Sequence, residues 1–129
     1  MDKPSIPEDI RRFVLTSIPS VPFLEALLLM HADPARQWRK DTLAQRLYVR
    51  EKTADGLLAD LCAAGMAAPC PAPSDAYCYA PDGAALRTRI DRLADLYATH
   101  LVEVTLLIHS SLDRKAQQFA NAFKWRKDS

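Results

Sequence analysis

The fold is decided by residues 38–81, WRKDTLAQRLYVREKTADGLLADLCAAGMAAPCPAPSDAYCYAP. Within this stretch, the apolar residues of 51–64 recur at i, i+3, i+4, i+7 and i+8, which is the spacing of one continuous helical face. A shorter helix is expected over 42–48, with Asp41 as its N-cap. Gly65 is expected to end the second helix, because glycine adopts the left-handed conformation at least cost. The stretch therefore predicts two consecutive helices joined by a tight connection.

A β-hairpin is expected after these two helices. Residues 66–70 and 76–80 are predicted as short strands, because the segment between them is rich in turn formers and Tyr77 alternates with its neighbours as in a half-buried strand. Residues 37–40 are predicted as a minor strand leading into the first helix. Helix, helix and hairpin in this order is the plan of a winged helix-turn-helix.

Further helices are predicted on both sides of this unit. Residues 5–35 are expected to form two helices, the first starting at a capping-box spacing of Ser5 and Glu8. The second, over 21–31, is apolar almost all round and should lie at the centre, with Ser20 as its cap. We therefore expect one mainly α domain over 1–129, in which 36–81 form the winged helix-turn-helix and 82–129 a C-terminal helical extension.

In that extension, apolar residues step by 4, 3, 4, 4, 3 and 4, a heptad-like seam whose irregular step near Leu101 predicts a kink. Asp82 is expected to cap the helix, and Arg87–Asp91 and Arg92–Asp95 to form ion pairs on its outer face. The seam is longer than a small winged-helix core needs, so we predict that it pairs two copies in a two-fold dimer. Packing within one chain is the alternative. The seam consists of Leu86, Ile90, Leu93, Tyr97, Leu101, Val104 and Ile108.

A last amphipathic helix is expected from about Ser111. It would present Leu112, Ala116, Phe119, Ala120 and Phe123 on one side. The chain then ends in a basic segment with Trp125, an aromatic residue of the kind that anchors protein partners.

Composition bounds the class of protein. The 129 residues, 49% hydrophobic and 26% charged, fit one globular domain. The longest apolar stretches, 23–30 and 101–108, are well short of the ~20 residues that cross a bilayer. No signal peptide is recognisable at the start, so a cytoplasmic protein is expected.

The three cysteines do not have the spacing of metal ligands. Reduced thiols that behave as small hydrophobes are the expectation for Cys62, Cys70 and Cys78. A redox role for Cys70 and Cys78, which would approach each other across the hairpin, is the alternative.

Four motifs carry a resemblance to a known family: Asp41-Thr42-Leu43-Ala44-Gln45-Arg46-Leu47, Leu57-Leu58-Ala59-Asp60-Leu61, Gly65-Met66 and Tyr77-Cys78-Tyr79-Ala80-Pro81. With these motifs the chain resembles the winged-helix domain of small bacterial regulators in the MarR-like and PadR-like grouping, and is similar to an uncharacterised bacterial winged-helix family of about this length. The motifs cover about a third of the chain and specify the fold better than the partner.

The resemblance implies that helix 51–64 enters the DNA major groove and that residues near its start contact the bases. By position, the implied DNA-binding residues are Arg50, Lys52 and Thr53, with Arg39, Lys40 and Arg46 on neighbouring segments. Two functions follow. The favoured one is a non-enzymatic, homodimeric DNA-binding transcriptional regulator, and the alternative is a winged-helix adaptor that binds a protein.

Charge bears on the choice between these functions. The net charge is +1, and residues 50–60 contain two basic and three acidic side chains. The expected hairpin tip, 71–75, contains no Lys or Arg to enter a minor groove. Since phosphate-facing surfaces gain affinity from Lys and Arg, these features favour the adaptor.

Catalytic chemistry has little support in the sequence. His100, Glu103 and His109 are the residues that hint at it, but His109 falls on another side of the helix and no third ligand converges with the other two. The three glycines, Gly56, Gly65 and Gly83, form no phosphate-binding loop. We therefore expect no enzyme, metal or cofactor.

Overall fold

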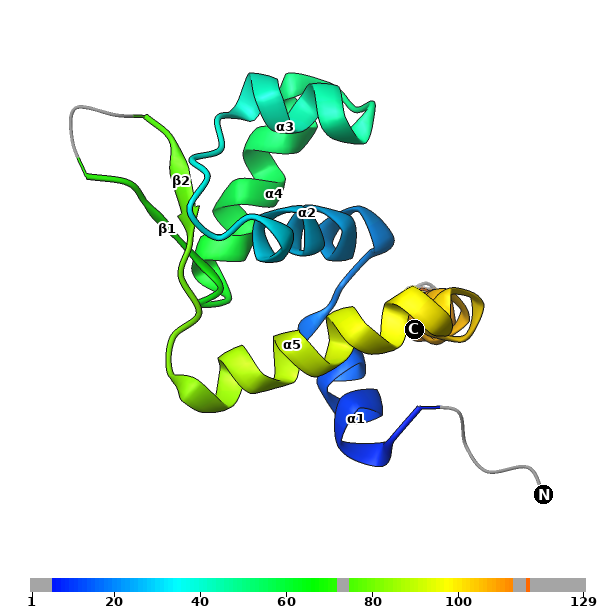
Figure 1. Ribbon diagram of the computed structural model, residues 1–129. Coiled ribbons are helices and arrows are strands. Elements are labelled where there is room, and N and C mark those ends of the chain that lie inside the picture. The colour runs from blue at the N-terminus through cyan, green and yellow to red at the C-terminus, as the bar shows by residue number, and fades with distance from the viewer. Residues whose placement is uncertain (1–5, 72–74, 113–115, 117–129) are drawn as a thin grey trace, which may run out of the picture.

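The computed structural model describes residues 6–71, 75–112 and 116. Within these residues the chain forms six helices and one two-stranded antiparallel hairpin (Figure 1). The elements are α1 (Glu8–Ser17), α2 (Val21–Ala32), α3 (Lys40–Leu47), α4 (Glu51–Ala63), β1 (Ala67–Pro69), β2 (Tyr77–Tyr79), α5 (Ala84–Thr99) and a last helix, Leu101–Leu112, here called the terminal helix.

Helix α2 lies at the centre, as its apolar sequence predicts. It contacts α3, α4, β2 and α5, and Figure 1 shows it between α3 and α4 on one side and α5 on the other. The predicted cap is confirmed, because the Ser20 hydroxyl oxygen accepts a hydrogen bond from the Phe23 N–H at 3.2 Å. The helix buries Phe23, Leu24, Ala26, Leu27 and Met30.

The hairpin follows α4 after a left-handed stop at Gly65, whose φ is 75°. The Gly65 N–H donates to the Cys62 carbonyl and the Met66 N–H to the Leu61 carbonyl, both at 3.0 Å, which is the hydrogen-bond pattern of a Schellman motif. The two strands pair in the register Ala67↔Tyr79, Ala68↔Cys78 and Pro69↔Tyr77. The minor strand predicted over 37–40 is present as a single bridge, Trp38↔Tyr77.

Three predicted helix starts differ from the structure. Helix α3 begins two residues earlier than predicted, with Arg39 as N-cap, and Asp41 lies in its first turn. Helix α5 has Gly83 as N-cap, because the Asp82 N–H donates at 2.8 Å to the Gly65 carbonyl and so still belongs to the end of the hairpin. Pro7 is the N-cap of α1, and Ser5 lies outside the described residues.

The C-terminal seam is divided between two helices and packs mainly inside the chain. The predicted kink is a break at His100, where α5 ends and the terminal helix begins. Leu86 and Tyr97 are half-buried against the core, whereas Leu101 is 52% exposed. The four remaining members are at most 1% exposed in the single chain, so they are not available to a second copy and their assignment to a dimer interface is wrong: Ile90, Leu93, Val104 and Ile108.

The outer-face ion pairs of α5 are also different from those predicted. The Asp91 carboxylate oxygen lies 2.8 Å from Nε2 of His31 in α2, within hydrogen-bond distance, and Arg92 pairs with Asp9 in α1. The guanidinium of Arg87 lies 5.6 Å from the centre of the Tyr79 ring. These side chains therefore tie α5 to α1, α2 and β2 instead of to its own next turn.

The amphipathic helix predicted from Ser111 does not begin there, since Ser111 is already inside the terminal helix. Its residues Phe119, Ala120 and Phe123, and Trp125, lie outside the described residues. No single helix in the described part of the chain is both long and apolar enough to span a membrane. The pair α1 and α2 meets that criterion only jointly, across a bend of 111°.

Candidate functional site

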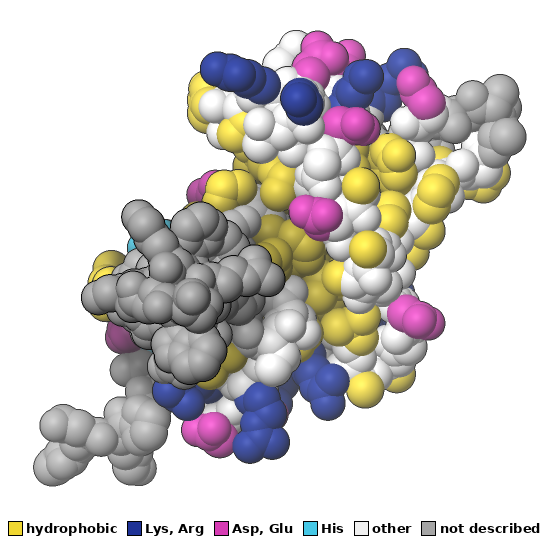
Figure 2. Space-filling view, turned by 180° about the vertical axis from the view of Figure 1, so that it is seen from behind, with side chains coloured by type: hydrophobic (Ala, Val, Ile, Leu, Met, Phe, Trp, Pro, Cys, Tyr) yellow, Lys and Arg dark blue, Asp and Glu magenta, His cyan; other side chains and the backbone are white. Residues whose placement is uncertain are grey.

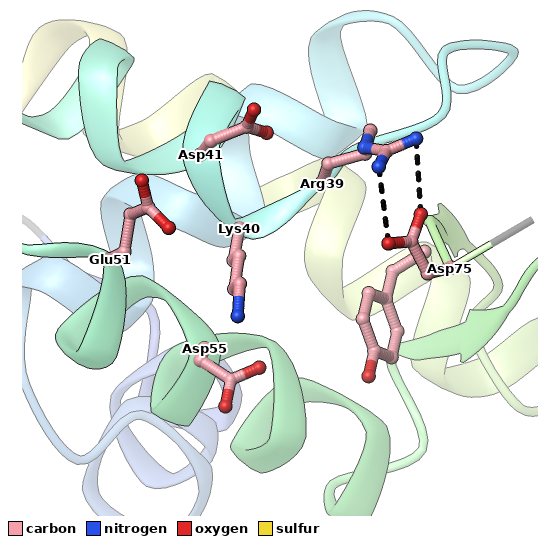
Figure 3. Close-up of a pocket in the computed structure, with 7 residues that line it drawn as sticks. Arg39, Lys40, Asp41, Glu51, Asp55 and Asp75 are labelled. Carbon is pink, nitrogen blue, oxygen red and sulfur yellow. Dashed lines mark hydrogen bonds and ion pairs between the residues drawn. The ribbon is translucent and has the colours of Figure 1, made fainter.

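A polar hollow lies where the starts of α3 and α4 meet the hairpin (Figure 3). We call it the α3–α4–hairpin cleft. Its volume is about 270 Å³, and four of its lining side chains are carboxylates whereas two are basic. The cleft is lined by Arg39, Lys40, Asp41, Glu51, Asp55, Asp75 and Tyr77.

One of the two basic side chains in the cleft is already paired. Both terminal nitrogens of Arg39 lie 3.1 Å from carboxylate oxygens of Asp75, in a two-pronged contact between the start of α3 and the hairpin. Both side chains are more than half exposed, so the pair adds little to stability, on the order of 0–1 kcal/mol. It does, however, neutralise Arg39. Lys40 extends into the cleft toward Asp55, with Glu51 on the neighbouring turn of α4 (Figure 3).

A buried tryptophan fixes this side of the cleft. Trp38 is 1% exposed, and its backbone N–H and carbonyl form hydrogen bonds of 2.8 and 2.7 Å with Tyr77. The Arg36 guanidinium lies 4.2 Å from the centre of the Trp38 ring, within cation–π distance. Trp38 is thus held by its backbone hydrogen bonds to Tyr77 and by the Arg36 guanidinium over its ring. Because Arg39 is the next residue in the chain, these contacts also restrain its backbone.

The residues predicted to contact DNA are all exposed. Arg39 and Lys40 line the cleft, and Arg50, Lys52 and Thr53 lie at the start of α4. Arg46 is near the other end of α3, 5.8 Å from the centre of the Trp38 ring, and lines a different hollow. The structure therefore brings five of the six to the same end of the α3–α4 pair, together with the four carboxylates.

The hairpin that contributes Asp75 and Tyr77 to the cleft is cross-linked by a disulfide between Cys70 and Cys78, whose Cα atoms are 5.7 Å apart. The expectation that these two cysteines are reduced is therefore wrong, and their predicted approach across the hairpin is confirmed. The loop that they close contains Asp75 and Tyr77, so the bond restrains two residues of the cleft. Cys62 remains a free thiol, and burial raises its pKa, which favours the protonated form.

A second hollow, of about 390 Å³, lies beside the turn between α3 and α4. Its rim includes Tyr48, which is 95% exposed and has a left-handed backbone with φ 58°. A non-glycine residue rarely adopts this conformation, because its Cβ crowds the backbone. The other lining residues are mainly apolar, with one acidic and one basic side chain. They are Glu25, Leu28, Leu29, Arg46, Leu47 and Tyr97.

The residues that hinted at chemistry are not assembled into a site. His100 shares a 2.8 Å hydrogen bond with the neighbouring Thr99, and Glu103 and His109 are exposed on the terminal helix. In 6–71, 75–112 and 116, no group of three or more His, Cys, Asp or Glu side chains is placed to hold a metal ion.

Sequence reasoning missed two features of the cleft. One is the pairing of Arg39 with Asp75, which are 36 residues apart. The other is the role of Trp38 as the buried anchor beside the cleft. A signal for the anchor was present, because Trp38 is the one large aromatic residue in the otherwise polar segment 36–40.

Comparison with known proteins finds no match to this chain, whether by family model, by sequence among curated proteins or by fold among solved structures. Its own surface is therefore the basis for a function. Figure 2 shows one face, where Lys and Arg side chains at the upper end are interspersed with Asp and Glu and do not form a uniform basic patch.

Proposed function

We propose that this chain is a winged-helix interaction module that binds a positively charged segment of a protein partner in the α3–α4–hairpin cleft, and that it acts by docking and not by catalysis. The observation that carries the proposal is the charge of the cleft. The cleft is lined by four carboxylates and two basic groups, and one of the basic groups, Arg39, is already paired with Asp75. A surplus of negative charge attracts lysine and arginine side chains.

The winged-helix assignment is supported by the order α3, α4 and hairpin, and by the bridge that joins Trp38 to β2. In DNA-binding winged helices, the second helix and the hairpin flank the bound duplex. The corresponding surface of this chain is the cleft. Carboxylates there would repel phosphates, so the same architecture suits a cationic partner better than a nucleic acid.

A second candidate is a homodimeric DNA-binding transcriptional regulator. It is favoured by the exposed Arg50, Lys52 and Thr53 at the first turn of α4, the part of such a helix that contacts base edges. Glu51 lies between Arg50 and Lys52 in the sequence, and Asp55 follows one turn later. These carboxylates would weaken phosphate binding by Arg50 and Lys52. We rank this function second for that reason.

The proposal is tested by selecting ligands for the purified chain from a phage-displayed random peptide library. The wild-type chain is expected to enrich peptides with two or more Lys or Arg residues, whose binding weakens as salt rises because exposed ion pairs are screened. The variant Glu51→Gln with Asp55→Asn should lose this enrichment. Asp95→Asn, an exposed carboxylate on α5, is the matched control and should retain it. Enrichment of uncharged peptides, or equal enrichment by the cleft variant, would refute the proposal.

A further inference from the structure

A hollow of about 260 Å³ lies between α1 and α5 and shares no lining residue with the α3–α4–hairpin cleft. We call it the α1–α5 hollow. Its lining residues from α1 are spaced at i, i+3, i+4, i+7 and i+8, so they belong to one face of that helix, and α5 supplies an arginine. The hollow is lined by Asp9, Arg12, Phe13, Thr16, Ser17 and Arg89.

The two basic side chains that line the hollow keep their charge unpaired. Arg12 and Arg89 are exposed, and neither takes part in an ion pair with any residue that the structure describes. The acidic lining residue, Asp9, is paired through both of its carboxylate oxygens with Arg92 of α5. The hollow therefore has a surplus of two positive charges.

The surroundings of the hollow do not cancel this surplus. Glu8 at the start of α1 lies 3.9 Å from Arg11, and Asp91 on α5 lies 2.8 Å from His31, so both acidic neighbours have a partner of their own. Figure 2 shows Lys and Arg side chains gathered at the lower end of the molecule, the end at which α1 lies in Figure 1. This end thus differs from the cleft, whose lining has more acidic than basic side chains.

Two hydroxyl groups line the hollow beside the arginines. The Thr16 hydroxyl donates a hydrogen bond of 2.9 Å to the Arg12 carbonyl, so its hydrogen is already used. The Ser17 hydroxyl lies 3.4 Å from that of Thr16, which is too long for a strong hydrogen bond, so Ser17 can donate to a bound group. The hollow therefore offers two guanidinium groups and one hydroxyl as hydrogen-bond donors.

We propose that the α1–α5 hollow binds the dianionic phosphate group of a small molecule, either inorganic phosphate or a phosphate monoester. A phosphate monoester carries close to two negative charges at neutral pH and presents three acceptor oxygens, which suits two guanidinium groups and a hydroxyl. Arginine binds phosphate in a two-pronged manner, with more donors than lysine. A nucleic acid or a membrane surface would need a wider basic surface than these two arginines. The inference does not depend on the proposed function of the cleft.

The test is isothermal titration calorimetry of the full chain at pH 8 with inorganic phosphate, phenyl phosphate and dimethyl phosphate as probes. The first two are dianions at this pH and are expected to bind at one site per chain. Dimethyl phosphate carries a single charge and should bind at least about tenfold more weakly. Tighter binding of phenyl phosphate than of inorganic phosphate would identify an ester as the ligand, and the reverse would identify free phosphate.

Substitutions in the hollow should weaken this binding. Arg12→Gln and Arg89→Gln are each expected to weaken phenyl phosphate binding by at least about tenfold, because each removes a charge-assisted contact. Ser17→Ala should weaken it severalfold. Arg11→Gln is the matched control, since it removes the same charge from the next position of α1, which does not line the hollow, and it should bind within about twofold of the wild-type chain.

The amide chemical shifts of the wild-type chain locate the site without any variant. Titration with phenyl phosphate should change them most at Arg12, Ser17 and Arg89. A wild-type chain that binds neither dianion would overturn the inference, as would equal binding of dimethyl phosphate, equal loss in Arg11→Gln, or shift changes confined to Arg50 and Lys52. Binding of a DNA duplex or of anionic lipid vesicles through Arg12 and Arg89, without binding of the small dianions, would assign the hollow to a larger partner and also overturn the inference.

Discussion

The α3–α4–hairpin cleft and the terminal helix differ in how many sides hold them. The cleft is restrained by the backbone pairing of Trp38 with Tyr77, by the Cys70–Cys78 disulfide and by the Arg39–Asp75 pair. The terminal helix is anchored on one face and exposes leucine and valine on another. A polar site that is already held in shape loses little conformational entropy when a ligand binds. The same small chain thus carries one polar surface restrained from several sides and one helix that is restrained on a single face.

The largest loss of stability is expected from a substitution at Trp38, which tests the difference in restraint between the cleft and the terminal helix. Trp38→Ala should destabilise the fold by about 3–5 kcal/mol, because it leaves a large cavity under the cleft. Urea unfolding followed by circular dichroism measures this loss. Leu106→Ala, at a 61% exposed position of the terminal helix, is the comparison, and its loss should be below about 1 kcal/mol. Equal losses for the two variants would contradict the difference in restraint.

The disulfide gives the next largest effect. Cys70→Ser with Cys78→Ser is expected to lower the free energy of unfolding by about 2–3 kcal/mol, because a cross-link of this loop length restricts the unfolded chain. Adding a reducing agent should destabilise the wild-type chain to the same extent and leave the double variant unchanged. Thermal unfolding with and without the reductant makes the measurement. If reductant shifts the variant as well, the effect does not come from this bond.

Tyr48 should give a small effect of the opposite sign. Tyr48→Gly relieves the left-handed strain at φ 58°, a cost of about 1 kcal/mol, and removes a side chain that is 95% exposed and packs against little. Glycine gains entropy in the unfolded chain, so the net change should lie between zero and a gain of about 1 kcal/mol. Tyr48→Ala keeps the strain and serves as the control. A clear loss of stability in Tyr48→Gly would show that the side chain is held by contacts.

The smallest effect is expected at the exposed pair that joins α1 to α5. The hydrogen bond from Arg92 lowers the pKa of Asp9 below its ordinary value. A carboxyl group whose pKa is lower in the folded state stabilises the fold above its unfolded pKa of about 3.9, and this contribution disappears as the pH falls through the folded pKa. Asp9→Asn should therefore reduce the melting temperature slightly at pH 6 and not at pH 2. A melting-temperature series across this range checks the sign, and an equal shift at both ends would exclude the pair as its source.

Much of the fold could be predicted from local pattern. The apolar periodicity of 51–64 and the turn formers after Gly65 correspond to α4 and the hairpin, and the all-round apolar character of 21–31 corresponds to the central α2. These predictions succeed because each depends on neighbours within a few turns of the chain. The start of α5 was missed because the Asp82 N–H pairs with Gly65, a tertiary contact that no cap rule contains.

The packing partners of the C-terminal seam and the electrostatic setting of the cleft could not be predicted from local sequence pattern. A heptad spacing predicts that Ile90 and Val104 are buried, but it does not predict which helices cover them. In the structure, α1 and α2 of the same chain contact α5, the helix that carries Ile90. The six candidate DNA-binding residues could be selected by position. Their electrostatic setting could not, because it depends on Asp75, which comes from the far side of the hairpin.

The preference of the cleft for cationic protein segments over DNA is tested most directly by fluorescence anisotropy with a labelled mixed-sequence duplex at low salt. We predict no rise in anisotropy with the wild-type chain. The variant Glu51→Gln, Asp55→Asn, Asp75→Asn, which removes three carboxylates and frees Arg39, should gain weak, salt-sensitive binding. Salt-sensitive binding by the wild-type chain that is lost in Arg50→Ala with Lys52→Ala would contradict the account and establish the DNA-binding alternative.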